Sequence, residues 1–154
     1  MIATWPPRVR RNLSRAGFLR FLDDCIEVRT LPSVPMISVV DDDESVRVSI
    51  GALVRSLGRV AKTFASAEDF LNSAEAQATD CLIADIQMPG MTGIELQQAL
   101  ATAGRRVPII FITAFPENRV REQVLAAGAV CLLSKPCDGD TLVNCIESAL
   151  ASLA

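Results

Sequence analysis

The stretch Cys81–Leu96, CLIADIQMPGMTGIEL, decides the fold class of this chain. Its first five residues, CLIAD, are almost continuously apolar, which is typical of a strand whose two faces are both covered by helices. A loop containing Pro and Gly follows, after which Ile94, Leu96 and Leu100 recur with helical spacing. We therefore predict a strand, a loop and a helix, which is the repeating unit of an α/β protein.

The same alternation continues on both sides of this stretch. Further strands are predicted at residues 36–40, 59–64, 107–112 and 129–133, and further helices at 44–57, from 66 onward (where SAED resembles a capping box), through 120–125 and at 140–150. Five strands in strict alternation with five helices indicate an α/β fold: a doubly wound (βα)5 parallel sheet with helices on both faces and the flavodoxin-like order 2-1-3-4-5. The strand at 59–64 is less apolar, so we expect it near an edge.

Length and composition indicate one soluble domain. A chain of 154 residues is about one domain long, and half of its residues are apolar while 21% are charged. The longest apolar run, near Val107–Ile112, is far shorter than the roughly 20 residues of a membrane helix. The net charge of −3 gives no general attraction to nucleic acid. We expect no membrane span, no direct DNA binding and, because the chain stops after the last helix, no second domain.

The cysteines and the absence of histidine narrow the possible chemistry. The five cysteines form no C-x-x-C pair and the chain has no His, so the usual ligand spacings of a zinc site and any Ser-His-Asp triad are missing. Cys81 and Cys131 lie in apolar strand-like runs and are expected in the core. Five unpaired thiols suit a reducing cytoplasm, where we expect the protein to be located.

Residues 1–35 differ in charge from the rest of the chain. They contain six Arg and three acids, a net charge of +3, whereas residues 36–154 carry −6. We expect a poorly ordered or partly helical basic extension, then a domain at 36–154. Another interpretation is a basic amphipathic helix at about 10–21 that touches a membrane surface or a partner. The alternating strands and helices begin at Met36, so a translation start placed too far upstream would also explain residues 1–35.

The residues directly after the strands carry most of the chemistry. In open α/β sheets, ligands bind beyond the carboxyl ends of the strands. We therefore expect one pocket to contain the polar residues that follow the first, third, fourth and fifth strands: Asp41, Asp42 and Asp43; Asp85; Thr113 and Ala114; Lys135 and Pro136.

Each of these groups also has an ordinary structural explanation. Asp43 fits the N-cap or first-turn acid of the helix at 44–57, and we prefer that explanation for this residue. Asp85 could be a solvated residue at a strand end. Thr113 could cap the next helix, and Lys135 could be an exposed loop cation. Their joint placement after four strands argues for a shared site.

Such a cluster matches the needs of phosphoryl transfer. Carboxylates within a few ångströms of one another cannot all ionise without a compensating cation. Hard oxygen ligands suit Mg²⁺, which binds one or two carboxylates and keeps waters and phosphate oxygens. A carboxylate can act as the nucleophile and form an aspartyl phosphate, while a lysine and a threonine stabilise the phosphoryl oxygens.

Four segments together resemble the receiver domain of bacterial two-component response regulators. They are VVDDDESVR at 39–47, CLIADIQMPGMTGIEL at 81–96, PIIFITAF at 108–115 and AGAVCLLSKP at 127–136. The resemblance covers about residues 36–150. It implies a phosphoacceptor protein that receives its phosphoryl group from a histidine kinase or a histidine phosphotransfer protein.

The resemblance also implies a role for each site residue. Asp85 would be the phosphoacceptor and a metal ligand, Asp42 would bind Mg²⁺ directly and Asp41 through water, and the backbone carbonyl of Gln87 would complete the set. Thr113 and Ala114 would contact the phosphoryl group, Lys135 would pair with it, and Pro136 would follow a cis peptide bond.

One position departs from the family pattern. The residue three before the lysine is commonly aromatic, but here it is Leu132. Leucine has no ring edge, so the usual coupling between the threonine and this aromatic residue is in doubt. The signal could travel through the loop after the fourth strand and Phe115, or activation could be weakly coupled. The simplest alternative is that Leu132 packs under the last two helices.

The leading interpretation is a single-domain signalling module that catalyses only its own phosphorylation and dephosphorylation. Phosphorylation would change a protein–protein surface read by an unknown target, and a homodimer could form through the fourth helix, fifth strand and fifth helix. A haloacid-dehalogenase-type phosphatase is disfavoured because Gln87 replaces that family's second acid. A receiver-like module that binds partners without phosphorylation is the remaining alternative.

Overall fold

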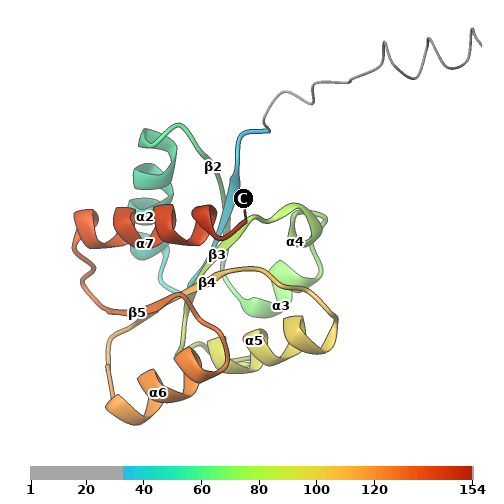
Figure 1. Ribbon diagram of the computed structural model, residues 1–154, viewed down its shortest axis with the longest axis vertical. Coiled ribbons are helices and arrows are strands. Elements are labelled where there is room, and N and C mark those ends of the chain that lie inside the picture. The colour runs from blue at the N-terminus through green and yellow to red at the C-terminus, as the bar shows by residue number, and fades with distance from the viewer. Residues whose placement is uncertain (1–32, 154) are drawn as a thin grey trace, which may run out of the picture. The chain divides into compact units, whose positions relative to one another are not determined.

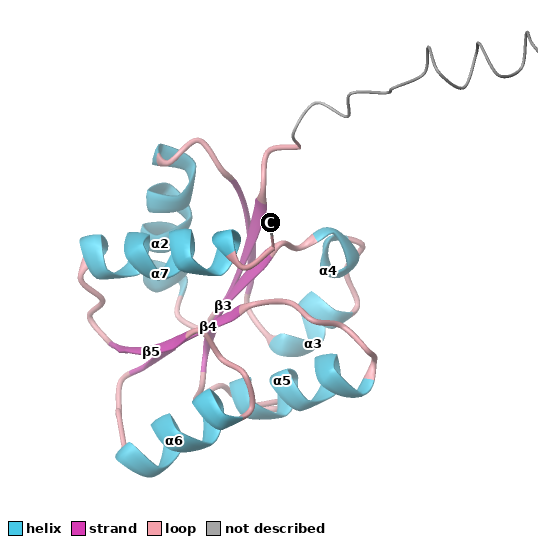
Figure 2. Cartoon of the chain, in the orientation of Figure 1, coloured by secondary structure: helices cyan, strands magenta, loops and turns pink. Residues whose placement is uncertain are grey.

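A five-stranded parallel sheet forms the centre of the domain. The computed structural model describes residues 33–153, and Figures 1 and 2 show the arrangement. The strand order is β2-β1-β3-β4-β5, which confirms the predicted topology. The strands are β1 (Met36–Val40), β2 (Val60–Phe64), β3 (Cys81–Asp85), β4 (Ile109–Thr113) and β5 (Cys131–Ser134).

Helices cover both faces of the sheet. They are α2 (Glu44–Ser56), α3 (Ala67–Leu71), α4 (Glu75–Ala78), α5 (Gly93–Thr102), α6 (Asn118–Ala126) and α7 (Gly139–Ala151). Successive side chains of a strand point to opposite faces, so Ile83 packs with the core under α2 and α7 and Leu82 with the core under α3 to α6. All five residues of β3 are buried, as predicted for a strand covered on both faces.

The helix predicted from Ser66 is divided in two, so the expected count of five helices is wrong for the described residues. Ser66 does cap α3, because its side chain accepts a hydrogen bond from the amide of Asp69. The helix then stops because Ser73 bonds locally: its hydroxyl donates to Phe70 O at 2.6 Å and accepts from the amide of Ala76 at 3.2 Å. The backbone therefore restarts as α4.

The remaining predictions on organisation have different outcomes. β2 is an edge strand, as expected from its composition. Between residues 33 and 153, no helix has the length and apolar character needed to cross a bilayer. The basic extension at 1–35, with its alternative helix at 10–21, lies outside the described residues except for 33–35 and stays a prediction.

Candidate functional site

Three carboxylates meet at the carboxyl end of the sheet. β1 and β3 are neighbours, so Asp41, which follows β1, lies beside Asp85, the last residue of β3. Asp41 is fully buried and Asp85 is 4% exposed, whereas Asp42 is exposed. One carboxylate oxygen from each lies within 4.8 Å of the others. The structure therefore brings together the three acids singled out in the sequence.

Lys135 supplies the positive charge of this cluster. Its Nζ lies 2.8 Å from Oδ2 of Asp41 and 3.0 Å from Oδ2 of Asp85. The residue follows β5, and its amide donates to Thr113 O at 2.8 Å. The Lys135–Pro136 peptide bond is cis. Lys135 is therefore held across β4 from the acids, and it is not the exposed loop cation of the ordinary explanation.

Burial and charge set the ionisation of the pair. Burial raises the pKa of Asp85, and the charge of Asp41 adds to this effect, while the hydrogen bond from Lys135 opposes it. Burial alone would lower the pKa of Lys135, but the carboxylates of Asp41 and Asp85 outweigh it and raise that pKa. Each partner thus favours the charged form of the other.

Asp41 has spare acceptor capacity. Its Oδ1 accepts from the amide of Asp43 at 2.9 Å, and its backbone carbonyl accepts from Arg47 Nη1 at 2.7 Å. Its buried Oδ2 faces Lys135 as an ion pair without a well-directed hydrogen bond. Such an oxygen, together with the carboxylates of Asp42 and Asp85, fits the hard oxygen ligands that Mg²⁺ prefers.

Asp43 has a structural role, as preferred from the sequence. It is the N-cap of α2, and its Oδ1 accepts from the amide of Ser45 at 2.8 Å and from the Ser45 hydroxyl at 2.7 Å. These hydrogen bonds lower the pKa of Asp43. The DDD triplet is therefore divided between the acidic cluster and a helix cap.

Thr113 is placed one residue beyond the partner of Asp85 on the adjacent strand. Asp85 is in register with Ile112 of β4, and Thr113 is 1% exposed. Its Oγ1 accepts from the amide of Phe115 at 3.1 Å, so it bonds the following loop and does not cap α6, which begins at Asn118. Ala114 is exposed beside it, and Phe115 is 62% exposed.

The loop after β3 is held by contacts that the sequence did not reveal. The amide of Gln87 donates to Asp85 Oδ1 at 3.1 Å, and Glu68 of α3 accepts from the amide of Met91 at 2.8 Å. A Cβ on Gly93 would lie 2.3 Å from Asp85 O. Thr92 and Glu95 form a capping box at the start of α5. The T-x-x-E motif at 92–95 is the sequence signal for this cap.

Leu132 is 2% exposed and belongs to the core cluster on the α3 to α6 face. That cluster includes Val124 of α6 and Phe111 of β4, whereas the apolar residues of α7 belong to the opposite face. The expectation that Leu132 packs under the last two helices is therefore right for α6 and wrong for α7.

Comparison with known proteins gives a match over most of the chain. The family model "Response regulator receiver domain" matches residues 37–147. Response regulator protein TmoT of Ectopseudomonas mendocina is 39% identical over 115 residues, which is 75% of this chain and 52% of that protein. Transcriptional regulatory protein TdiR of Thauera aromatica is 37% identical over 113 residues, 73% of this chain and 50% of that protein. The chain spans about half the length of these curated relatives.

Solved structures agree in fold. Response regulator StyR has a TM-score of 0.72 at 39% identity and covers 77% of this chain and 60% of that one. A response regulator receiver protein from Burkholderia phymatum has a TM-score of 0.67 at 43% identity, with 76% and 95% coverage. Vibrio cholerae chemotaxis protein CheY4 has a TM-score of 0.71 at 27% identity, with 77% and 100% coverage.

Proposed function

Because this chain belongs to the response regulator receiver domain family of two-component signalling, we propose that Asp85 accepts a phosphoryl group. The observation that carries the proposal is the Asp85 carboxylate at the end of β3, 3.0 Å from Lys135 and beside Asp41 and Asp42. The donor is a phosphohistidine of a histidine kinase or phosphotransfer protein. A carboxylate oxygen of Asp85 attacks phosphorus, and the electron pair of the broken P–N bond returns to the donor imidazole.

Lys135 and Thr113 are proposed to stabilise the phosphoryl group. The Lys135 ammonium is paired with the Asp85 carboxylate. Phosphorylation converts this carboxylate into an acyl phosphate and removes its charge, so the ammonium can then pair with a phosphoryl oxygen. Thr113 Oγ1 accepts from the Phe115 amide, so its own proton remains available to a second phosphoryl oxygen. Ala114, the next residue, leaves the approach to this site open.

Asp41, Asp42 and Asp85 are proposed to hold Mg²⁺, with the backbone carbonyl of Gln87 as a further ligand. When bound, the ion neutralises phosphoryl oxygens and the acids around them. Asp42 is the accessible carboxylate of the three, so it marks the side from which ion and donor approach.

The output is proposed to be an altered protein–protein surface on α6, β5 and α7, which is also the face through which a homodimer would form. Leu132 is too buried to report the state of the site at the surface, so Phe115, joined to Thr113 by its amide, is the better candidate.

The receiver is proposed to span residues 36–154 and residues 1–35 to be dispensable for phosphorylation. A cytoplasmic location and the absence of DNA contact belong to the same proposal.

The test is phosphorylation by a small donor. The full chain is incubated with Mg²⁺ and acetyl phosphate, and a hydroxylamine-labile adduct is sought by mass spectrometry. Wild type and Asp43→Asn should form it, because Asn also caps a helix, and Asp85→Asn should not. Beryllofluoride should shift the amide resonances of Thr113 and Phe115. An unmodified wild type would instead favour a binding module that is not phosphorylated, and an equal adduct in Asp85→Asn would show that Asp85 is not the phosphoacceptor.

A further inference from the structure

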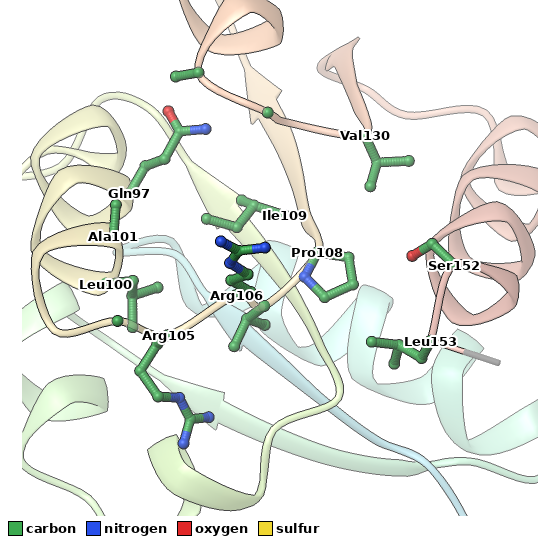
Figure 3. Close-up of a pocket in the computed structure, with 14 residues that line it drawn as sticks. Gln97, Leu100, Ala101, Arg105, Arg106, Pro108, Ile109, Val130, Ser152 and Leu153 are labelled. Atoms are coloured by element: carbon green, nitrogen blue, oxygen red, sulfur yellow. The ribbon is translucent and has the colours of Figure 1, made fainter.

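A cavity of about 680 Å³ opens at the amino ends of the strands, opposite the edge that contains Asp85 (Figure 3). Its walls come from the ends of α5, α6 and α7 and from the segment 104–109 that leads into β4. The volume is within the range of ligand pockets, roughly 300–1,000 Å³. No step proposed for Asp85 uses this cavity, so it calls for a separate explanation.

The cavity is positively charged within an acidic domain. Arg105 and Arg106 line it and no Asp or Glu does, although residues 36–154 carry a net charge of −6. Arg105 is already engaged, because it donates to Gln77 O at 3.0 Å and to Ala76 O at 2.6 Å. In Figure 3 its side chain turns away from the cavity, whereas the Arg106 guanidinium lies in the middle of it.

Arg106 is the group available to a ligand. It is exposed, and its side chain forms no ion pair or hydrogen bond with the residues that the structure describes. Two of the helix carbonyls at this end already accept hydrogen bonds, since Arg105 N donates to Leu100 O and Ala129 N to Val124 O. A carboxylate would find an unpaired guanidinium there.

The remaining lining adds an apolar floor and one hydrogen-bond acceptor. Leu100 and Ile109 are buried beneath the cavity, and Leu153 is half-exposed at its rim. Gln97 is 7% exposed, and its Nε2 donates to Val124 O at 3.4 Å. Its amide oxygen accepts no hydrogen bond from residues 33–153, so it can accept one from a ligand.

We propose that this cavity binds an acidic peptide segment of a partner protein. An Asp or Glu of the peptide pairs with Arg106, a neighbouring apolar side chain covers Leu100 and Leu153, and a peptide N–H donates to Gln97. A free phosphate would leave the apolar floor uncovered, and a fatty acid would leave the Gln97 oxygen unpaired. A nucleic acid would bring phosphates to Arg106 but no apolar side chain to cover Leu100 and Leu153. The site is independent of phosphorylation.

The test uses the full chain labelled with ¹⁵N and a short peptide in which Asp and Glu alternate with Leu. The readout is the amide resonances of Gly104, Gly128 and Ser152, because the N-terminal arginines can bind an acidic peptide elsewhere. These resonances should shift and saturate. Arg106→Gln should weaken the site by about tenfold, the loss of one charge-assisted hydrogen bond, and added salt should weaken it further.

Arg119→Gln is the matched control, since Arg119 is exposed near the start of α6 and does not line the cavity. It should leave the affinity unchanged. A second control peptide has each acid replaced by its amide and should bind at least about tenfold more weakly. Any of three results would overturn the proposal. They are the absence of shifts at these three amides, an equal loss of peptide affinity in both arginine variants, and equal affinity for the uncharged peptide.

Discussion

The ammonium of Lys135 lies 2.8 Å from Oδ2 of Asp41, a carboxylate with no exposed surface. The same ammonium bonds Asp85 at 3.0 Å, so one cation holds two buried acids at the end of the sheet. Removing it would leave two buried negative charges without a partner, which costs more than an exposed ion pair contributes.

Lys135→Met should therefore lower the free energy of unfolding by about 2 kcal/mol in the absence of divalent ions, less than the roughly 3–5 kcal/mol lost from a fully buried pair because Lys135 is partly exposed. Urea denaturation followed by circular dichroism measures this. Lys62→Met is the control: its ion pair with Glu75 spans 3.9 Å at the surface, and its loss should cost less than about 0.5 kcal/mol. Equal losses of stability in the two variants would show that burial does not strengthen the Lys135–Asp41 ion pair.

Mg²⁺ should stabilise the protein, because the proposed site brings Asp41, Asp42 and Asp85 together only in the folded chain. At ten times the dissociation constant the gain is about 1.4 kcal/mol, visible as a higher melting temperature. Asp42→Asn should abolish the Mg²⁺-dependent part with little change in metal-free stability, since Asp42 is exposed. The same Mg²⁺ response in Asp42→Asn and wild type would remove Asp42 from the metal site.

Gly93→Ala should destabilise the protein by about 2 kcal/mol, because its new methyl group would lie 2.3 Å from Asp85 O and 3.0 Å from the Cα of Ile86. It should also slow phosphorylation by displacing Asp85. Gly139→Ala is the matched change at another helix start, where nothing lies within 4 Å, and stability should be unchanged or slightly higher. An unchanged free energy of unfolding in Gly93→Ala would mean that β3 and α5 separate easily.

Leu132→Ala should lower the free energy of unfolding by about 3 kcal/mol, since it opens a cavity in the core on the α3 to α6 face. The Asp85 adduct should still form, because Leu132 packs among the apolar side chains of that cluster. Leu125→Ala, at an exposed position of α6, should cost under about 1 kcal/mol. A Leu132→Ala variant that is stable but cannot be phosphorylated would show that Leu132 acts on the site directly.

Cys81 should resist alkylation. Burial raises the pKa of its thiol to about 12, so at pH 8 about one molecule in ten thousand carries the reactive thiolate. The thiolate fraction, and with it the reactivity of Cys81 in the folded protein, should increase about tenfold for each pH unit below that value. Iodoacetamide labelling followed by peptide mass spectrometry should find Cys81 unmodified in native buffer and modified in urea. Rapid native labelling would place Cys81 outside the core.

Much of the fold was predictable because its signals are local. The apolar run of β3 and the helical spacing of α5 are written in neighbouring residues, as is the cap that Asp43 forms on α2. The break between α3 and α4 was missed, because the Ser73 bonds compete with a helix that the apolar pattern alone would continue.

The sequence by itself determined the order of strands and helices and the residues that follow each strand, since periodicity and turn residues act over a few positions. Only the tertiary structure decided which of these residues meet. Lys135 reaches Asp41 and Asp85 because β4 and β5 carry it there, and Gly93 matters because α5 starts against the end of β3. The cavity around Arg106 likewise exists only where three helix ends converge. Such contacts join distant positions, and their geometry depends on how whole elements pack.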